Sequence, residues 1–432
     1  MRRVLLIAFH FPPFQGSSGV QRTLSFCRSL PMSGWMPGVL TTHSRAFPNT
    51  TDDQLGDIPS GVEVKRAFAL DSSRHLSFGG RYSKLTALPD RWITWLPSAV
   101  ISGLRYIRKR RPDVLWSTYP IATAHVIAWA LNRLTGVPWV ADFRDPMVET
   151  IDRTGEQFPR DPRERRARLW VEALVARRAA CAVFCTHSAR EIFSRRYPEV
   201  SAERLRVIEN GFDEEIFAEV ERSSLSAYQY ADRPLTLLHS GVLYRSTDRS
   251  PEWLLDALHG LVAQSALSAR DLCVVLRASG NDHEYAPMIA ARGLQDIVRL
   301  ESPVGYREAL AEMMAADGLL LLQGYTSNPA IPAKAYEYLR ARRPIFALVD
   351  SDGETARLIE RTGVGRIVPM DDPQRIASGL LNFIKEVRQG VIAPLSDMLV
   401  AQYSRQARAA ELAQLFDSVV AASRVPSARS AP

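Results

Sequence analysis

The feature that most constrains the fold of this chain is a regular alternation of short apolar runs with helix-like segments. In the first half, the apolar runs have the length and composition of strands that are buried on both faces of a sheet. They occupy residues 4–9, 39–42, 114–117, 139–142, 182–185 and 206–208. Helix-like segments lie between them, at residues 21–30, 97–110, 122–135 and 164–178. This alternation predicts βαβ units in a doubly wound α/β sheet.

The alternation pauses at a polar stretch, residues 218–233, which we interpret as an inter-domain linker. It then restarts with strands at 235–240, 273–278, 298–300, 318–322 and 345–349. Helices are expected between them at 252–264, 286–292, 306–316, 333–341 and 354–362. We therefore predict two Rossmann-like domains, at 1–215 and 216–400, a final helix within 401–422 and a disordered tail at 423–432. A ligand cleft is expected between the domains, at the carboxyl ends of both sheets.

The composition is that of a globular protein, with 46% hydrophobic and 23% charged residues in 432. Four cysteines are too few for a disulfide framework in a chain of this length, which favours a reducing, cytoplasmic compartment. The apolar run after Met1 is too short for a signal peptide and is interrupted by His10 and two prolines. No stretch approaches the roughly 18–20 apolar residues of a membrane span.

The formal net charge of +7 suits an anionic substrate, an anionic lipid surface or nucleic acid, and equally an ordinary solvated surface. We assign it no nucleic-acid role. Residues 92–111 combine two tryptophans with apolar residues at helical spacing and a basic end. This pattern is typical of an interfacial helix at the inner membrane face, and also of a core-packed helix with a basic end.

A glycine-serine loop, formed by Gly16, Ser17, Ser18 and Gly19, separates the first strand from the helix that follows. Its backbone N–H groups and the positive end of the helix suit a phosphate or a substrate oxygen. The Gly-x-Gly-x-x-Gly spacing of dinucleotide-binding folds is absent, and an ordinary turn remains the alternative.

Polar side chains also follow the strands predicted at 139–142 and 114–117. Asp142, Arg144 and Asp145 lie at one strand end, where open α/β sheets keep their ligand groups. Carboxylates there can accept sugar hydroxyls or a proton, and Arg144 offers a planar set of donors. The alternative is an ion cluster that fixes a loop. His125 lies near the other strand end and is a candidate catalytic residue or a structural histidine.

In the second half, Gly241 is followed by Arg245 and Arg249 at a strand exit, a pattern that suits a diphosphate. Farther along, Lys334 and Glu337 share a face of the helix that begins near Ala333. The lysine can neutralise phosphate, the free N–H groups of the helix start can bind it, and the glutamate can bind a ribose diol. The alternatives are a solvent loop and a surface ion pair.

Cys181 and Cys185, with His187 nearby, have a spacing that could suggest zinc. They lie in an apolar strand and lack a second pair of ligands, so we interpret them as buried structural residues and predict no metal site.

The ordered set of motifs resembles the family-four-like glycosyltransferases of the GT-B fold. It comprises His-Phe-Pro-Pro at 10–13 with the glycine-serine loop, Gly-Trp at 34–35, Pro-Trp-Val-Ala-Asp-Phe-Arg-Asp-Pro at 138–146, Asn-Gly-Phe-Asp at 210–213, His-Ser-Gly at 239–241, and Pro332, Lys334, Glu337, Tyr338 and Leu339. The resemblance spans residues 4 to about 350.

The resemblance implies two facing Rossmann-like domains, with the acceptor mainly on the first and a nucleotide-sugar donor on the second. It also implies anomeric retention, no required metal or other cofactor, and a last helix that returns to the first domain. By position, Gly16, Ser17 and Ser18 would lie near the donor phosphate, and Arg245 would face the diphosphate. The loop that contains Val304 and Tyr306 would lie by the nucleobase, and Glu337 would take the ribose.

Two positions depart from the family pattern. Pro329 stands where many members have a sugar-contacting glutamate. Where many members have Lys-Gly after the diphosphate arginine, this chain has the run 245–249, so that Arg249 or Lys334 would substitute for the lysine.

The mechanism expected from this resemblance is transfer of a sugar to a glycan, as in polysaccharide biosynthesis, to a lipid-linked acceptor or to a small molecule. Arg245 and Lys334 would stabilise the departing diphosphate, while Asp142, Asp145 or His125 would position the acceptor. The leaving phosphate would take the acceptor's proton. The alternatives are a nucleotide-sugar epimerase of the same fold and a catalytically silent GT-B subunit that binds a partner.

Overall fold

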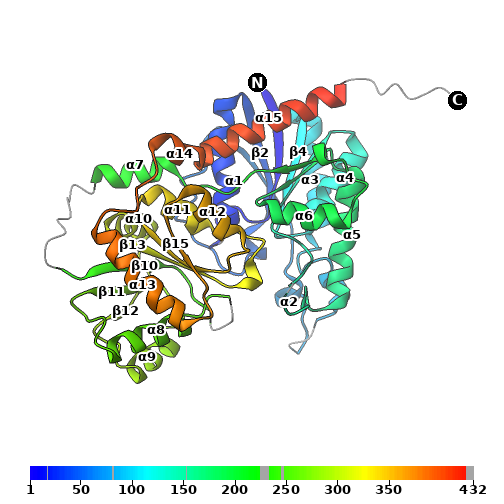
Figure 1. The fold of residues 1–432 in the computed structure, drawn as a ribbon. Helices are drawn as coiled ribbons and strands as arrows, with labels where there is room; N and C mark the ends of the chain where they lie inside the picture. Colours follow the sequence, from blue (N-terminus) through cyan, green and yellow to red (C-terminus); the bar gives the residue numbers. More distant parts are fainter. Residues whose placement is uncertain (17, 80–81, 152, 224–232, 245–247, 425–432) are drawn as a thin grey trace. The chain divides into compact units, whose positions relative to one another are not determined.

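The structure is a computed structural model that describes residues 1–16, 18–79, 82–151, 153–223, 233–244 and 248–424. It divides into two compact units (Figure 1). The first unit is Met1–Asn210 together with the chain from Arg405 onward, and the second is Gly211–Ser404.

The first unit is built on a parallel sheet with the strand order β3-β2-β1-β4-β5-β8-β9. Its strands are β1 (Arg2–Ile7), β2 (Trp35–Thr42), β3 (Glu63–Ala67), β4 (Val114–Thr118), β5 (Trp139–Arg144), β8 (Cys181–Phe184) and β9 (Leu205–Val207). The order begins 3-2-1-4-5 in chain sequence, as in Rossmann folds. The doubly wound parallel sheet expected from the alternation is thereby confirmed. Sequence reasoning missed β3 because this half-exposed edge strand contains charged residues.

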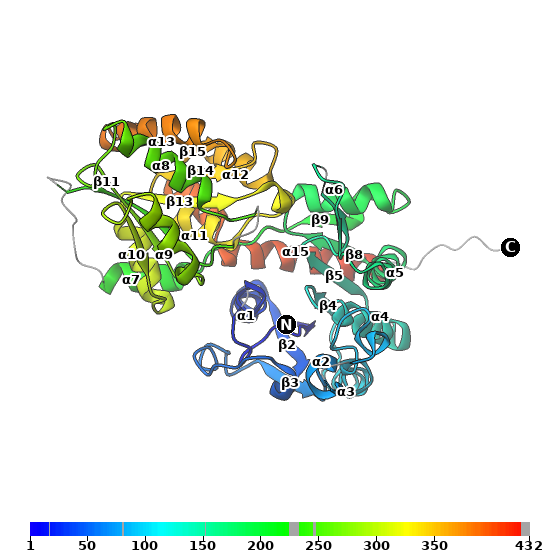
Figure 2. The same cartoon turned by 90° about the horizontal axis from the view of Figure 1, so that it is seen from below.

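Helices cover both faces of this sheet (Figure 2). The helices of this unit are α1 (Ser18–Ser29), α2 (Ser72–His75), α3 (Trp95–Arg110), α4 (Thr123–Thr135), α5 (Pro162–Arg178), α6 (His187–Arg196) and α15 (Arg405–Arg424). A short antiparallel pair, β6 (Glu149–Thr150) and β7 (Gln157–Phe158), lies in the connection after β5.

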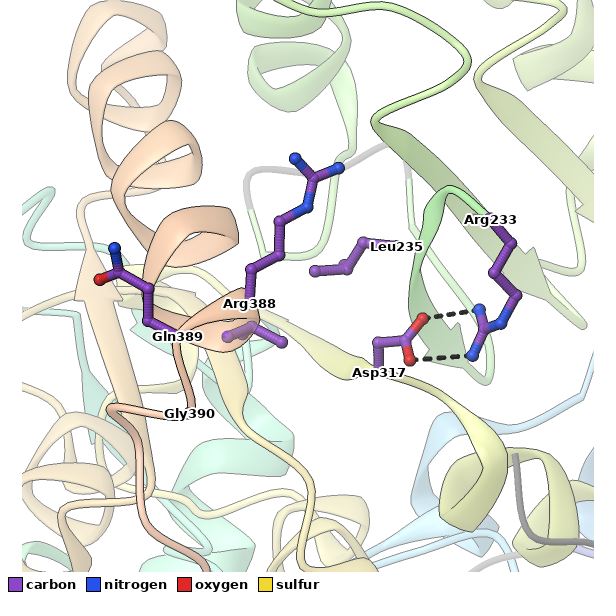
Figure 3. A pocket seen from close by; sticks show the side chains of 7 residues that line it. Arg233, Leu235, Asp317, Arg388, Gln389 and Gly390 are labelled. Atoms are coloured by element: carbon purple, nitrogen blue, oxygen red, sulfur yellow. Dashed lines mark hydrogen bonds and ion pairs between the residues drawn. The ribbon is translucent and has the colours of Figure 1, made fainter. Parts of the chain in front are cut away.

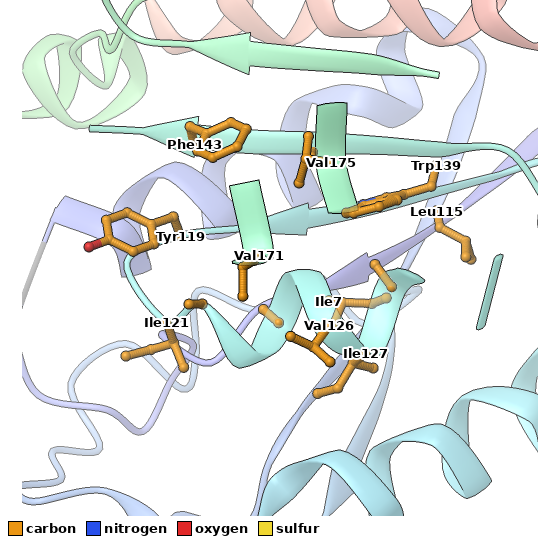
Figure 4. Close-up of a cluster of buried hydrophobic side chains, with 14 of the residues drawn as sticks. Ile7, Leu115, Tyr119, Ile121, Val126, Ile127, Trp139, Phe143, Val171 and Val175 are labelled. Atoms are coloured by element: carbon orange, nitrogen blue, oxygen red, sulfur yellow. The ribbon is translucent and has the colours of Figure 1, made fainter. Parts of the chain in front are cut away.

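Alternate residues of the strands enter two separate cores. Ile7 and Trp139 pack with side chains of α4 and α5 on one face of the sheet (Figure 4). Leu6 packs on the opposite face with α1 and with Phe416 of α15. Asp417 of α15 accepts a hydrogen bond from the Trp35 indole at 3.1 Å. The expected return of the last helix to the first unit is therefore confirmed.

The second unit repeats the architecture with the strand order β12-β11-β10-β13-β14-β15, all parallel. Its strands are β10 (Leu235–Ser240), β11 (Leu272–Arg277), β12 (Val298–Glu301), β13 (Gly318–Gln323), β14 (Ile345–Val349) and β15 (Gly365–Val368). Its helices are α7 (Glu214–Ser223), α8 (Glu252–Ala263), α9 (Asp282–Ala291), α10 (Tyr306–Ala315), α11 (Ala333–Ala341), α12 (Glu354–Thr362), α13 (Pro373–Arg388) and α14 (Asp397–Gln402).

In each sheet the strand order changes direction between two neighbouring parallel strands. These strands are β1 and β4 in the first unit and β10 and β13 in the second. Open α/β sheets bind ligands at the carboxyl ends of such strands, because the following loops diverge there and leave a crevice. The loops after these four strands are therefore the places to search for a site.

The predicted linker is wrong for residues 218–223, which belong to α7. Phe217 and Val220 of this helix are buried in the core of the second unit, and its exposed face carries Glu215, Glu219 and Arg222. Residues 224–232 lie outside the described part of the chain, as do residues 425–432 of the predicted tail. The prediction of disorder is wrong for residues 423 and 424, which belong to α15. Within the described residues, no helix has both the length and the apolarity needed to cross a membrane.

Candidate functional site

A buried ion pair occupies the carboxyl end of β5 in the first unit. Both carboxylate oxygens of Asp142 accept from the guanidinium of Arg22, at 3.1 Å from Nε and 2.8 Å from Nη2. Thr118 donates a third hydrogen bond at 2.8 Å. Asp142 is fully buried and Arg22 is 5% exposed. The same guanidinium donates to the carbonyl oxygens of Ile208 and Glu209, at 3.0 Å each.

This geometry gives Asp142 a different place from the one expected. Its oxygens are engaged by Arg22 and Thr118 and shielded from solvent, so they cannot accept an acceptor hydroxyl in this arrangement. The pair instead fixes α1 against the ends of β5 and β9. Sequence reasoning missed Arg22, although a signal exists: it lies between Val20 and Leu24, which are both buried, and a charge within a buried stripe requires a partner.

His125 also lies in the core rather than in a crevice. Its side chain is fully buried against Phe143, with ring centroids 5.2 Å apart. Its Nδ1 is 2.7 Å from Ser117 Oγ, and that hydroxyl accepts from the Trp139 indole at 2.7 Å. Burial lowers the pKa of His125 from 6.5 to about 3. The alternative of a structural histidine fits this placement, and a catalytic contact does not.

Other predicted residues of the first unit do reach the carboxyl edge of the sheet. Arg144 adopts a left-handed backbone (φ 61°) where the pairing of β5 with β8 shifts register, and Asp145 follows it, partly exposed. His10 stacks on Phe14 with centroids 4.4 Å apart and planes at 16°. Burial and the Arg144 charge lower the pKa of His10 to about 3, so the ring is neutral. Together they form an aromatic face beside a guanidinium.

The glycine-serine loop follows β1 at the same edge. Gly16 is exposed and adopts φ +88°, a conformation that favours glycine. Ser17 lies outside the described residues, and Ser18 is placed only as the first residue of α1. Gly19 is buried, and its carbonyl accepts from Thr23 Oγ1 at 3.2 Å. The structure therefore places Gly16 between β1 and α1, whereas Ser18 and Gly19, which were expected in the loop, belong to the first turn of α1.

In the second unit, the loop after β10 and the helix α11 that follows β13 bring four predicted residues together. A Cβ atom built on Gly241 would lie 2.7 Å from Lys334 Nζ, so the lysine amine rests directly against this glycine. Gly241 adopts φ +126° and donates its N–H to Arg277 at 2.9 Å. The charges of Arg249 and Glu337 both act on Lys334. Arg245 lies outside the described residues.

Lys334 has a neighbour that sequence reasoning did not assign. Its Nζ is 3.3 Å from Nε2 of His239, the buried residue near the end of β10. Burial and the Arg249 charge lower the pKa of Lys334 to about 7, while the Glu337 carboxylate opposes the shift. A signal for His239 was available, since it is a titratable residue that directly follows two leucines near the carboxyl end of β10.

Arg249 is held by the loop that follows β13. Asp248 lies 3.4 Å from the Arg249 Nε and accepts a hydrogen bond from Thr326 Oγ1 at 2.9 Å. The guanidinium carbon of Arg249 lies 5.4 Å from the Tyr244 ring centroid. These contacts link the loops after β10 and β13.

Glu337 lies one turn beyond Lys334 on α11 and accepts a hydrogen bond from Tyr306 Oη at 2.8 Å. Tyr306 begins α10, directly after the loop that contains the partly exposed Val304. Ala333 is the first residue of α11, and Pro332 is its N-cap. Residues predicted for the nucleobase, the ribose and the phosphates therefore lie on one continuous edge of this unit.

Pro329 lies in the loop between β13 and α11, and hydrogen bonds from the Gln323 side chain fix the backbone of this loop. Gln323 Nε2 donates to the carbonyl oxygens of Ser327 and Ala330, at 2.7 and 2.9 Å. The loop thus has a defined shape without a carboxylate at position 329.

Comparisons with known proteins now identify the chain's relatives. Residues 18–211 match the family model of the glycosyl transferase 4-like domain. No curated protein sequence matches the chain. The chain has a GT-B fold, and most of its first unit is similar to the glycosyl transferase 4-like domain.

Solved structures of similar fold cover nearly all of this GT-B chain. The sucrose-phosphate synthase of Thermosynechococcus elongatus aligns with 98% of this chain and 100% of its own, with a TM-score of 0.67 and 16% identity. Anabaena HepE in complex with UDP and glucose aligns over 97% and 100%, with a TM-score of 0.62 and 17% identity. WaaG, a glycosyltransferase involved in lipopolysaccharide biosynthesis, aligns over 98% and 100%, with a TM-score of 0.59 and 12% identity.

The cysteines of the GT-B chain are free and buried. Burial raises the pKa of both Cys181 and Cys185 to about 12, and the Cys185 thiol lies 3.7 Å from Asn210 Oδ1. In the part of the chain that the structure describes, no three His, Cys, Asp or Glu side chains are grouped to hold a metal.

The tryptophans of residues 92–111 belong to the core of the first unit. Trp95 is fully buried, and the Trp92 indole donates to the Ala46 carbonyl at 3.1 Å. The interpretation of these tryptophans as interfacial anchors is therefore wrong. The outer face of α3 carries Ile101, Arg105 and Arg108, which are exposed.

A cavity of about 460 Å³ lies elsewhere in the second unit (Figure 3). Leu235, at the start of β10, and Arg388, at the end of α13, line it beside the bidentate pair of Arg233 and Asp317 at 2.8 and 2.9 Å. It lies at the amino-terminal edge of the sheet and contains none of the predicted site residues.

Proposed function

We propose that the chain is a retaining, metal-independent glycosyltransferase that moves a sugar from a nucleoside-diphosphate sugar to an acceptor. The observation that carries this proposal is the contact of Lys334 with Gly241 and its grouping with Arg249 and Glu337 in the second unit. The Lys334 amine and the Arg249 guanidinium stand beside the Glu337 carboxylate, on α11 and on the loop after β10, the segments that follow the two strands at the reversal point of the sheet. A nucleoside diphosphate presents complementary groups, namely phosphate anions and a ribose diol.

Each part of the donor has a partner in this proposal. Lys334 and Arg249, with Arg245 and the N–H groups at the start of α11, bind the diphosphate and stabilise its charge as it departs. Glu337 accepts the ribose hydroxyls. Val304 and Tyr306 face the nucleobase. For the Gly16–Gly19 loop of the first unit we propose a phosphate or another substrate oxygen as the ligand.

The acceptor binds to the first unit at the edge that Arg144 and Asp145 occupy. The acceptor hydroxyl attacks from the face that the diphosphate leaves, and the departing phosphate takes its proton. Two observations support a reaction without a strong protein base. Asp142 is held in a buried ion pair with Arg22. Burial also lowers the pKa values of His10 and His125, so both rings are neutral and weak bases. No resident cofactor takes part.

The test is nucleotide release from UDP-, GDP- and ADP-sugars, with and without oligosaccharide or polyprenyl-phosphate acceptors. UDP-glucose comes first, because HepE has been solved in complex with it. Transfer releases nucleoside diphosphate in proportion to glycosylated product. Epimerisation changes the sugar without release, and a silent subunit does neither.

Substitution separates the proposed site from general effects. Lys334→Ala and Glu337→Ala should each abolish most turnover. The matched control is Arg366→Ala, which breaks an exposed ion pair with Glu386 on β15 and should leave turnover unchanged. Full activity of both site variants would refute the donor assignment.

A lipid-linked acceptor would require contact with the inner face of the cytoplasmic membrane, and we propose the outer face of α3 for it. Ile101, Arg105 and Arg108 fall at helical spacing on this face and are exposed. Binding to liposomes should increase with anionic lipid and fall in an Arg105→Glu/Arg108→Glu variant. Arg163→Glu/Arg166→Glu, on the exposed start of α5, is the control. Binding that ignores lipid charge would exclude this contact.

A further inference from the structure

The hydrogen bond between Lys334 and His239 fixes which partner donates. His239 Nδ1 lies 3.0 Å from the carbonyl oxygen of Leu320, and a carbonyl can only accept. Nδ1 therefore carries the proton, and the lone pair of Nε2 faces Lys334 Nζ at 3.3 Å. Burial, together with the Lys334 charge, lowers the pKa of His239 well below its usual value, so the ring stays neutral. Lys334 is the donor.

The surroundings restrict where the amine can go. Gly241 forms one wall, because even a methyl group at this position would lie 2.7 Å from Nζ. Tyr338, on the same helix, accepts from the Ser240 N–H at 3.1 Å and ties α11 to the end of β10. The charged groups that act on Lys334 are Arg249, from the loop after β10, and Glu337, one turn along α11. The amine is thus held at the strand end, facing one cation and one anion.

We propose that His239 is a positioning residue that holds the Lys334 amine where the donor diphosphate binds, and that diphosphate binding is accompanied by uptake of one proton at Lys334 Nζ. This inference rests on the proposed function. In the free protein, burial and Arg249 disfavour the charged ammonium. A diphosphate placed against Nζ brings negative charge that favours it. The proton comes from the buffer, and no covalent bond changes.

The magnitude follows from linkage. The pKa of Lys334 is lowered to about 7 in the free protein, so at about pH 8 roughly nine-tenths of the amine is neutral. If the bound diphosphate restores a pKa near the usual value of about 10.4, binding takes up about 0.9 proton at this pH. The terminal phosphate of a nucleoside diphosphate, with a pKa of about 6, is already ionised there and contributes little.

The experiment is calorimetric titration of the whole chain with UDP, followed by GDP and ADP, near pH 8 in buffers of different ionisation enthalpy. The wild type should take up about 0.9 proton near pH 8, and about half a proton at pH 7. Lys334→Arg, which is always charged, should retain binding without uptake. His239→Phe should weaken binding and reduce the uptake, and His239→Gln, which restores an acceptor, should recover both in part.

The outcomes separate this inference from the function on which it rests. Binding of a nucleoside diphosphate with no uptake, or with the same uptake in Lys334→Arg, overturns the inference and leaves the proposed function intact. Failure of all three nucleotides to bind refutes both. His239→Phe is interpreted only with an unchanged melting temperature, and the Lys334→Arg comparison decides the question if that variant does not fold.

Discussion

Removal of Arg22 tests whether Asp142 is a structural or a catalytic residue. The Arg22→Ala variant leaves a fully buried carboxylate that has lost two of its three hydrogen-bond donors, those at 3.1 and 2.8 Å. Breaking a buried ion pair by removing one partner costs about 3–5 kcal/mol, because the remaining charge stays buried without compensation. The carbonyl oxygens of Ile208 and Glu209 and the side-chain amide oxygen of Asn210 lose the same donor, so we expect the upper part of this range.

The assay is thermal and urea unfolding of the first unit's transition. For a unit of this size, each kcal/mol shifts the melting temperature by about 2–4 °C, which predicts a decrease of about 10 °C or more. Arg195→Ala is the matched control, since it removes an exposed i,i+4 pair with Glu191 and should cost at most about 1 kcal/mol. An Arg22→Met/Asp142→Leu double variant should recover much of the loss, because an apolar pair carries no desolvation penalty.

The same variants decide the catalytic question. If Asp142 only holds α1 in place, the double variant should keep most of the turnover of the wild type at a temperature where both are folded. A double variant that is stable and inactive would refute the structural role. An Arg22→Ala variant whose free energy of unfolding lies within about 1 kcal/mol of the wild-type value would also refute it, since a buried carboxylate that loses its partner costs more than that.

Three further predictions follow from the same geometry. Gly241→Ala should raise the dissociation constant for UDP or another bound nucleoside diphosphate at least about tenfold, because the new methyl group displaces Lys334 Nζ; unchanged affinity in calorimetry would contradict it. Glu337→Gln should weaken binding about 10- to 100-fold through the lost charged hydrogen bond, and 2′-deoxy nucleotides should lose less between wild type and variant. The pKa of His125 is about 3 in the folded state and about 6.5 in the unfolded state, so only the unfolded state binds a proton between these pH values. The free energy of unfolding should therefore decrease as the pH falls below about 6.5, by about 1.4 kcal/mol per pH unit. His125→Phe should flatten this part of the stability curve relative to wild type while kcat/KM at neutral pH stays the same, and an unchanged slope would show that the histidine is not buried neutral.

The sequence was sufficient for the architecture because alternation of apolar runs is a local signal. It placed the strands on both sides of each reversal point, and with them the segments that follow these strands and contain Gly241 and Lys334. It could not place β3, whose charged residues lie at a solvated edge. It also could not pair Arg22 with Asp142, because the two are 120 positions apart and only the parallel order of β1, β4 and β5 brings α1 beside the end of β5.

The depth of a side chain at a strand end, rather than its position along the strand, separates ligand-facing groups from structural ones. Asp142 and Asp145 are three residues apart at the same edge, yet the first is fully buried against Arg22 and the second is partly exposed after the register shift at Arg144. A carboxylate enclosed by its own donors has no capacity left for a substrate. In the second unit the same criterion divides His239 from Lys334: the buried ring accepts from the lysine and holds it, while the half-buried amine keeps hydrogens to donate to a phosphate. The residues that contact substrate should therefore be sought among the more exposed polar side chains that lie next to each buried polar group.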